Sequence, residues 1–185
     1  MVGRPLPESE LLDRARGGDE GAYGALVEMH EHIAFRVAYA VLHDAAEAEE
    51  AAQDGFVKAY RSLGRFRRGS PFRPWLLRIV GNEARNRVRA RSRREGLTRR
   101  VAGADVSGGA APPPEAAVLE REQREELFAA IAALRPDDRL AVIGRFFLGL
   151  TDEEAAAALG VRRGAVKMRV FRALERLRLE LEGPA

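Results

Sequence analysis

The spacing of the apolar residues constrains this chain more than any other feature of its sequence. Residues such as Tyr23, Leu26, Ile33 and Val37 return at intervals near 3.6, which is the period of an amphipathic helix. We find no convincing alternation of apolar and polar residues of the kind that a half-buried strand requires. The sequence therefore predicts an all-α fold.

One central stretch interrupts the helical pattern. Between residues 95 and 114 the periodicity fails, and the strings Gly108-Gly109 and Pro112-Pro113-Pro114 are typical of a linker. We therefore predict two small helical domains, over residues 1–94 and 115–185, joined by a flexible linker over residues 95–114. The second domain is expected to contain a helix-turn-helix.

The net charge of +3 hides a strong asymmetry along the chain. Residues 1–57 hold 4 Arg or Lys against 12 Asp or Glu, whereas residues 58–100 hold 15 against 2. A second basic run, residues 161–180, holds 7 against 2. Two basic blocks in a nearly balanced chain indicate two surfaces that face a polyanion, although arginines on solvated faces would give the same composition.

Helix boundaries in the first domain follow from capping signals. Asp44 with Glu47 three residues later forms a possible capping box, which predicts a helix through about Ser62. Residues 64–70 break the pattern and indicate a loop. Ser70-Pro71 resembles an N-cap followed by proline at the first helical position, so a long helix is expected from there.

The second domain carries the strongest local motif. Thr151 and Glu154 have capping-box spacing, Gly160 stands where a turn needs positive φ, and a new helix is predicted over about residues 163–181. Two helices joined by a short glycine-containing turn form a helix-turn-helix. A generic helical hairpin with an arginine-rich face remains the alternative.

The second helix of this motif has one apolar face and one face rich in cationic residues. Residues expected to face the core are Val166, Val170, Ala173, Leu174 and Leu177. Residues left for the outside of its N-terminal half are Arg162, Arg163, Lys167, Met168, Phe171 and Arg172. A helix that enters the major groove needs cations for phosphates and guanine edges, and Phe171 is expected either to meet a thymine methyl or to join the core.

These motifs resemble a known family. Residues 134–174 resemble region 4 of the sigma-70 family through Gly149-Leu150-Thr151, Glu153-Glu154, Ala156, Leu159-Gly160, the string from Gly164 to Arg169, and Arg172-Ala173. The first domain resembles region 2 through Ala48-Glu49-Glu50, Gln53, Phe56, Phe66, Phe72, Trp75-Leu76, Ile79 and Asn82. Only these two regions fit in the chain, which is typical of the compact extracytoplasmic-function (ECF) subfamily.

The resemblance implies a sigma factor, a subunit that binds core RNA polymerase, directs it to promoters and promotes melting of the −10 element. The implied partners are core RNA polymerase, through its β′ clamp helices and β flap, promoter DNA and an anti-sigma factor. It implies no enzymatic activity of the chain alone, no cofactor and no metal site.

The family's roles transfer to matching positions. The surface that docks on polymerase corresponds to Glu49, Glu50, Gln53, Asp54 and Phe56. The loop and helix that receive the −10 element correspond to Arg65, Phe66, Arg67, Arg68, Phe72, Arg78, Asn82, Arg85, Asn86 and Arg89. The recognition helix for the −35 element offers Lys167, Met168, Phe171 and Arg172 to base edges, and Arg162, Arg163 and Arg169 to phosphates. Trp75 lies on the apolar face of its helix, which favours core packing over base stacking.

Two details qualify the helices and the DNA binding that we expect. Gly55, Gly81 and Gly144 fall inside predicted helices, where each costs up to about 1 kcal/mol relative to alanine. The isolated protein is expected to bind DNA weakly, because polymerase must fix the spacing of its two DNA surfaces.

Other functions compete with this interpretation. Metal-dependent or nucleotide-dependent catalysis is disfavoured, because the three histidines are not clustered and neither a P-loop nor a Gly-x-Ser-x-Gly motif is present. A free-standing helix-turn-helix regulator and a sigma-like decoy that binds an anti-sigma factor remain open. The chain has no cysteine, no signal-peptide pattern and no run of about 18 apolar residues, so we expect a cytoplasmic protein without membrane insertion.

Overall fold

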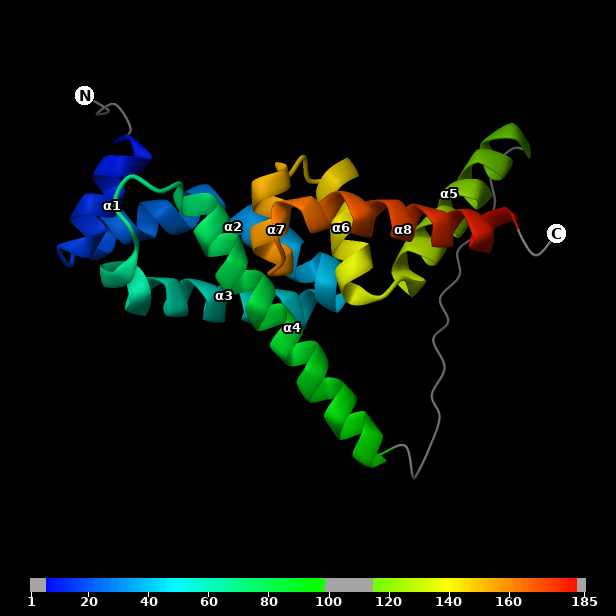
Figure 1. Ribbon diagram of the computed structural model, residues 1–185, viewed down its shortest axis with the longest axis horizontal. Coiled ribbons are helices and arrows are strands. Elements are labelled where there is room, and N and C mark those ends of the chain that lie inside the picture. Colours follow the sequence, from blue (N-terminus) through cyan, green and yellow to red (C-terminus); the bar gives the residue numbers. More distant parts are fainter. Residues whose placement is uncertain (1–5, 99–114, 183–185) are drawn as a thin grey trace.

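The computed structural model describes residues 6–98 and 115–182, with side chains over residues 6–94 and 124–182. All regular structure in these ranges is helical, which confirms the predicted fold class (Figure 1). The elements are α1 (Glu8–Arg16), α2 (Glu20–Leu42), α3 (Ala45–Ser62), the 3-10 turn η1 (Leu63–Arg65), α4 (Phe72–Thr98), α5 (Glu115–Ala133), α6 (Pro136–Phe146), α7 (Asp152–Leu159) and α8 (Arg163–Glu182). We refer to α1–α4 as the first half and to α5–α8 as the second half.

Side-chain caps set the boundaries between the early helices. The Asp19 carboxylate accepts a hydrogen bond from the Ala22 amide at 3.0 Å, which starts α2. Helix α2 ends at His43, which adopts a left-handed conformation with φ of 55°. Asp44 then accepts a hydrogen bond from the Glu47 amide at 2.8 Å, so the predicted start of α3 is confirmed.

Helix α1 is an element that the sequence analysis did not predict. Its residues Leu11, Leu12 and Ala15 are buried against the core of the first half. A carboxylate oxygen of Glu8 lies 2.6 Å from Nε2 of the buried His30 in α2. These contacts give α1 the apolar and polar partners that such a short helix needs, because isolated helices of this length are marginal in water.

Helix α4 is the longest element and runs away from the body of the molecule (Figure 1). It begins at Phe72, one residue later than the proline-first start predicted at Pro71. It continues to Thr98, past residue 94 where the first domain was expected to end. The rest of the predicted linker, residues 99–114, lies outside the described residues.

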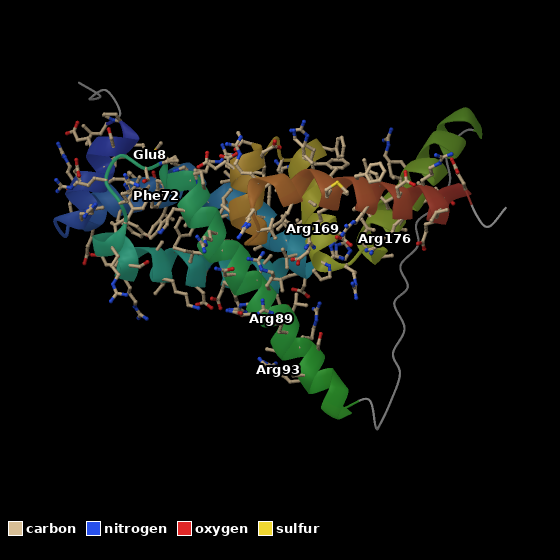
Figure 2. The ribbon with its side chains drawn as sticks, viewed as in Figure 1. Glu8, Phe72, Arg89, Arg93, Arg169 and Arg176 are labelled. Carbon is tan, nitrogen blue, oxygen red and sulfur yellow. The ribbon has the colours of Figure 1, made fainter. Side chains whose placement is uncertain are left out.

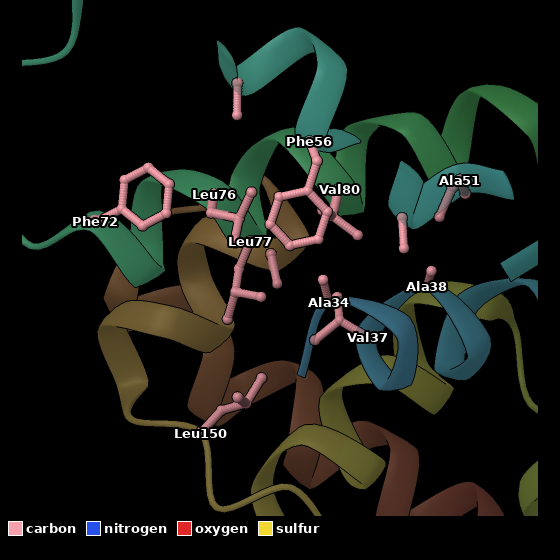
Figure 3. Packing of buried hydrophobic residues seen from close by; sticks show 14 of the residues in the cluster. Ala34, Val37, Ala38, Ala51, Phe56, Phe72, Leu76, Leu77, Val80 and Leu150 are labelled. Carbon is pink, nitrogen blue, oxygen red and sulfur yellow. The ribbon is translucent and has the colours of Figure 1, made fainter. Parts of the chain in front are cut away.

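The two halves pack against each other and share one hydrophobic core. Helix α7 lies along α4, and α6 lies against α2. Figure 3 shows Leu76 and Leu77 of α4 above Leu150, which precedes α7, and all three are buried in the same cluster. A smaller cluster, which includes Ile131 of α5, Val142 of α6 and Ala173 of α8, holds the second half together.

Glycine marks two close approaches between helices. A Cβ at position 55 in α3 would come 2.7 Å from Cγ2 of Val80 in α4. A Cβ at position 81 in α4 would overlap the carbonyl oxygen of Ala158 in α7. The helix propensity lost at Gly55 and Gly81 is therefore offset by tighter packing of α4 on both of its neighbours.

No helix in the described part of the chain is both long enough and apolar enough to cross a membrane.

Candidate nucleic-acid interface

Helices α7 and α8 form the predicted helix-turn-helix. The Thr151 hydroxyl accepts a hydrogen bond from the Glu154 amide at 3.2 Å, and the Glu154 carboxylate accepts one from the Thr151 amide at 2.8 Å. Gly160 ends α7 in the left-handed region with φ of 67°, as its position in the motif predicts. The Val161 amide bonds back to the Ala156 carbonyl oxygen at 3.0 Å, which closes the turn.

The surface of α8 is sorted largely as the sequence predicts. Val166, Ala173 and Leu177 are buried, but Leu174, which we expected to face the core, is 40% exposed. Phe171 is 58% exposed, which removes the alternative that it joins the core. The exposed residues at the start of α8 are Arg162, which directly precedes the helix, and Arg163, Lys167, Met168, Phe171 and Arg172 within its N-terminal half. One continuous face therefore combines cations with two apolar side chains.

Arg169 differs from the other predicted phosphate contacts of α8. It is half-buried and faces α6, where its guanidinium lies 3.4 Å from a carboxylate oxygen of Asp137 and 3.5 Å from one of Asp138. These ion pairs attach α8 to the start of α6. In this arrangement Arg169 is already partnered within the protein.

The loop before α4 presents its arginines and hides its aromatic rings. Arg65, Arg67 and Arg68 are exposed, whereas Phe66 and Phe72 are 5% and 0% exposed. The ring of Trp75 lies 4.8 Å from that of Phe66 and 5.6 Å from that of Phe72, between ring centroids. Both phenylalanines were expected to contact DNA, but in this arrangement their rings form the packed base of the loop and are not accessible to a DNA strand.

Contacts from α1 and α2 fix this aromatic cluster in place. The His30 ring lies 5.4 Å from the ring of Phe72, and Figure 2 shows Phe72 and Glu8 at the same end of the molecule. Nη1 of Arg16 donates to the Phe66 carbonyl oxygen at 2.8 Å. The first two helices therefore determine the shape of the loop.

The outer face of α4 carries four of the predicted −10 contacts: Arg78, Asn82, Asn86 and Arg89 are all exposed. Arg85, on the same helix, is only 9% exposed. It donates to the carbonyl oxygen of Ala158, just before the turn of the helix-turn-helix, and to Oδ1 of Asn82 at 2.6 Å. The expectation that Arg85 lies open to DNA is therefore wrong for this arrangement of the two halves.

The environment of Arg85 is unfavourable for its charge. Burial lowers the pKa of its guanidinium, and the positive charges of Arg89 and Arg169 lower it further, while Asp137 acts in the opposite direction. Carbonyl and amide oxygens supply its hydrogen bonds, so its burial is compensated without a neutralising carboxylate bond.

Arg139 joins the halves at a second point, and the sequence analysis missed it. It is 6% exposed and donates from Nε to the Ala40 carbonyl oxygen at 2.8 Å and from Nη2 to the Val41 carbonyl oxygen at 2.7 Å. Nη1 donates to the carbonyl oxygens of Ala132 and Leu134 at 2.5 and 3.4 Å. Burial, followed by the charge of Arg91, lowers its pKa. The only sequence signal was a charge beside the apolar run that starts at Leu140.

Helix α3 exposes the acidic face predicted to dock on polymerase. Glu49, Glu50, Gln53 and Asp54 are exposed, and Phe56 is buried behind them, at 7% exposure. Arg87 of α4 donates to Glu50 at 2.7 Å and to Asp54 at 2.6 Å. Burial disfavours the charge of Arg87, but these two hydrogen bonds outweigh it and raise its pKa. Part of the acidic face is therefore paired within the protein.

Comparison with known sequences gives two matches in the same order as the two halves. Residues 26–94 match the family model for sigma-70 region 2, and residues 124–177 match the model for sigma-70 region 4. The chain is 35% identical over 180 residues to the RNA polymerase sigma-H factor of Pseudomonas aeruginosa, covering 91% of this chain and 90% of the relative. It is also 35% identical over 177 residues to the ECF RNA polymerase sigma-E factor of Escherichia coli K12, covering 92% of each chain.

Comparison with solved structures gives similar folds. CnrH, in complex with the cytosolic domain of CnrY, matches with a TM-score of 0.64 and 26% identity, over 96% of this chain and 99% of that one. The sigma factor RpoE of Bartonella quintana, in complex with the anti-sigma factor NepR, matches with a TM-score of 0.64 and 26% identity, over 88% and 98%.

Proposed function

We propose specific roles for the surfaces of this chain from the premise that it belongs to the sigma-70 family, within its ECF group. The chain is an RNA polymerase sigma factor, and sigma factors are transcription initiation factors without enzymatic activity of their own. The proposal concerns which residues contact polymerase and DNA, and in which arrangement of the halves they do so.

We assign a different set of binding partners to each of the two matched regions. Residues 1–94 bind core RNA polymerase, through its β′ clamp helices, and the −10 element. Residues 115–185 bind the −35 element and the β flap. CnrH and RpoE of Bartonella quintana are similar to this chain and were solved with CnrY and with the anti-sigma factor NepR, so we also infer an anti-sigma partner here. Because polymerase and promoters are cytoplasmic, the chain acts in the cytoplasm.

The proposal for the −35 element rests on the two faces of α8, one exposed and rich in cations, the other buried and apolar. Lys167, Met168, Phe171 and Arg172 are exposed near the start of a recognition helix whose opposite side is buried. Cationic side chains can bind guanine edges and phosphates in the major groove, and apolar ones can contact a thymine methyl. Arg162 and Arg163 then hold the flanking phosphates.

The proposed −10 surface is smaller than the sequence suggested. It consists of the exposed loop arginines and the outer face of α4: Arg65, Arg67, Arg68, Arg78, Asn82, Asn86 and Arg89. Arginine side chains track a strand through its phosphates, and polar side chains contact its bases. Arg85 joins this set only when α7 leaves α4, because Ala158 otherwise occupies its guanidinium. Full engagement of a melted −10 strand therefore requires separation of the halves.

The acidic face of α3 is the proposed polymerase-docking surface. Glu49, Glu50 and Asp54 present carboxylates that complement basic side chains of a partner, and Gln53 adds a neutral hydrogen-bonding group. The buried ring of Phe56 supports the helix from behind, so it fixes the position of these side chains without itself being accessible.

A purified transcription assay tests the proposal. Core bacterial polymerase is mixed with fragmented genomic DNA from the source organism, with and without the protein, and the 5′ ends of the transcripts are sequenced. We expect new start sites that share two upstream motifs. A Lys167→Ala/Arg172→Ala double variant should lose these starts while still binding core polymerase.

Arg178→Ala provides a matched control, because Arg178 lies on the same helix but forms an ion pair with Glu182 at 3.0 Å, near the far end. It should transcribe normally. Unchanged transcription by the double variant would disprove the −35 assignment. A folded protein that binds polymerase but gives no new starts would indicate the decoy function. Tight sequence-specific binding in a gel shift without polymerase would indicate a free-standing regulator.

A further inference from the structure

A basic cleft lies where α4 and α8 diverge, beside the start of α6. Its volume is about 750 Å³. In Figure 2, Arg89 of α4 and Arg169 and Arg176 of α8 lie around the angle between these two helices. Six arginines line the cleft, against two aspartates, so its wall carries a clear excess of positive charge.

The two aspartates are already engaged by a subset of these arginines. Asp138 forms ion pairs with Arg169 and Arg176, and Asp137 pairs with Arg169. The other four, Arg85, Arg89, Arg135 and Arg172, have no carboxylate partner among the described residues. Like charges held this close repel one another, and the lowered pKa of Arg85 in the cleft wall reflects burial together with this crowding. An anion in the cleft would relieve that repulsion.

We propose that this cleft is a binding site for a compact, multiply phosphorylated anion. Guanidinium groups bind phosphate oxygens through paired, charge-assisted hydrogen bonds, and several converging arginines suit several phosphates. The volume lies within the range of small-molecule sites. Val88, Pro136 and Met168 add apolar wall on which the non-phosphate part of a ligand can pack.

The site exists only when the halves are packed together. Arg85, Val88 and Arg89 come from α4, while the other lining residues come from the second half. A ligand that binds only this arrangement stabilises it over the separated one. Arg89 and Arg172 also belong to the proposed DNA surfaces, so an occupied cleft competes with promoter phosphates. This last consequence depends on the proposed function, whereas binding itself does not.

Calorimetric titration of the full chain with sodium tripolyphosphate tests the site. We expect saturable binding with one ligand per chain. Arg135→Gln should weaken it about tenfold, as expected for the loss of one charge-assisted contact. Arg61→Gln is the matched control, because Arg61 is exposed on α3, is not among the residues that line the cleft, and its removal changes net charge equally. Equal effects of both variants, or no saturation, would overturn the proposal.

Two further probes identify the source of the phosphates. If a short single-stranded oligonucleotide loses affinity on Arg135→Gln as tripolyphosphate does, the natural ligand is a nucleic-acid backbone. If only tripolyphosphate responds, it is a free phosphorylated compound. If polyglutamate binds through Arg135 and tripolyphosphate does not, the site takes acidic protein segments and the proposal is wrong.

A separate measurement tests whether ligand binding stabilises the arrangement in which the two halves are packed together. The chain has no cysteine, so cysteines placed at Ser92 on α4 and Glu175 on α8 can be labelled selectively for energy transfer. Tripolyphosphate should enrich the high-transfer population, and Arg135→Gln should shift this response to about tenfold higher concentrations. No enrichment would overturn the link. Arg135 lies outside the proposed DNA surfaces, so normal promoter-specific transcription by Arg135→Gln would separate failure of the cleft from failure of the sigma function.

Discussion

Gly81 of α4 faces the carbonyl oxygen of Ala158 in α7 with no room for a Cβ between them. A substitution by alanine inside a helix normally raises stability by about 1 kcal/mol. For Gly81→Ala we expect the opposite, a loss of about 1–3 kcal/mol in the free energy of unfolding, because a backbone oxygen cannot rotate away from the new methyl. Urea denaturation measures this difference.

Gly24 offers the matched control. It lies inside α2, and a Cβ there would meet nothing within 4 Å, so Gly24→Ala should raise stability by up to about 1 kcal/mol. If Gly81→Ala stabilised the protein as Gly24→Ala does, the halves would not be packed together in solution.

Arg139→Met should destabilise the protein by about 2–4 kcal/mol, because it removes hydrogen bonds from a buried charge to Ala40, Val41, Ala132 and Leu134. The carbonyl oxygens of Ala40 and Val41 lose these partners at the C-terminal end of α2. Thermal unfolding followed by circular dichroism provides the measurement, and Arg61→Met, at an exposed position, is the control. Equal stability of both variants would show that the Arg139 contacts contribute little.

Arg87→Gln should change polymerase binding more than it changes stability. Arg87 is paired with Glu50 and Asp54 at the surface, and exposed ion pairs contribute about 1 kcal/mol or less. Its removal leaves both carboxylates available for a basic partner, so association with core polymerase should become a few-fold faster at low salt.

Lys58→Gln is the control for Arg87→Gln, because it also removes one positive charge from an ion pair, here with Glu83, but outside the docking face. Stopped-flow association should separate the two variants. Identical association rates would mean that the acidic face of α3 is not where polymerase docks.

Alkaline pH should weaken the fold through Tyr23. Burial raises its pKa from 10.0 to about 12, although a hydrogen bond with the Tyr60 backbone acts in the opposite direction. The unfolded phenol therefore loses its proton at a lower pH than the folded one, so the free energy of unfolding falls as pH rises between these two values. Denaturation at about pH 8 and about pH 11 measures the slope.

Tyr23→Phe should be less stable at neutral pH, by about 1 kcal/mol, because the Tyr23 hydroxyl donates to the Phe56 carbonyl oxygen at 2.6 Å. It should lose less stability than the parent protein on going to high pH. An equally steep loss in the variant would assign the alkaline sensitivity to other groups.

Local signals in the sequence predicted much of the helical layout. Asp44 with Glu47 and Thr151 with Glu154 marked two helix starts, because capping depends on residues only three positions apart. The exposed face of α8 followed from helical period alone. Leu174 was the exception, because how far a helix face is covered depends on the neighbouring helices and not on its own spacing.

What the sequence could not show depends on contacts between distant segments. The roles of Arg85 and Arg139 are set by carbonyl groups 73 and about 99 positions away, which no periodicity records. Phe66 and Phe72 match the family's loop, but the packing of α1 and α2 puts both rings inside. From the sequence alone, Gly55, Gly81 and Gly144 only lower helix propensity. The structure shows that Gly55 and Gly81 allow close packing against Val80 and Ala158.

The aromatic cluster beneath the loop also gives the protein an optical reporter of the contact that we propose between this loop and promoter DNA. Trp75 is the chain's single tryptophan, and its indole lies against Phe66 at the base of the arginine-bearing loop. Any rearrangement of that loop on a DNA strand changes the polarity around the indole. The wavelength of its fluorescence emission therefore follows the loop in the unlabelled protein.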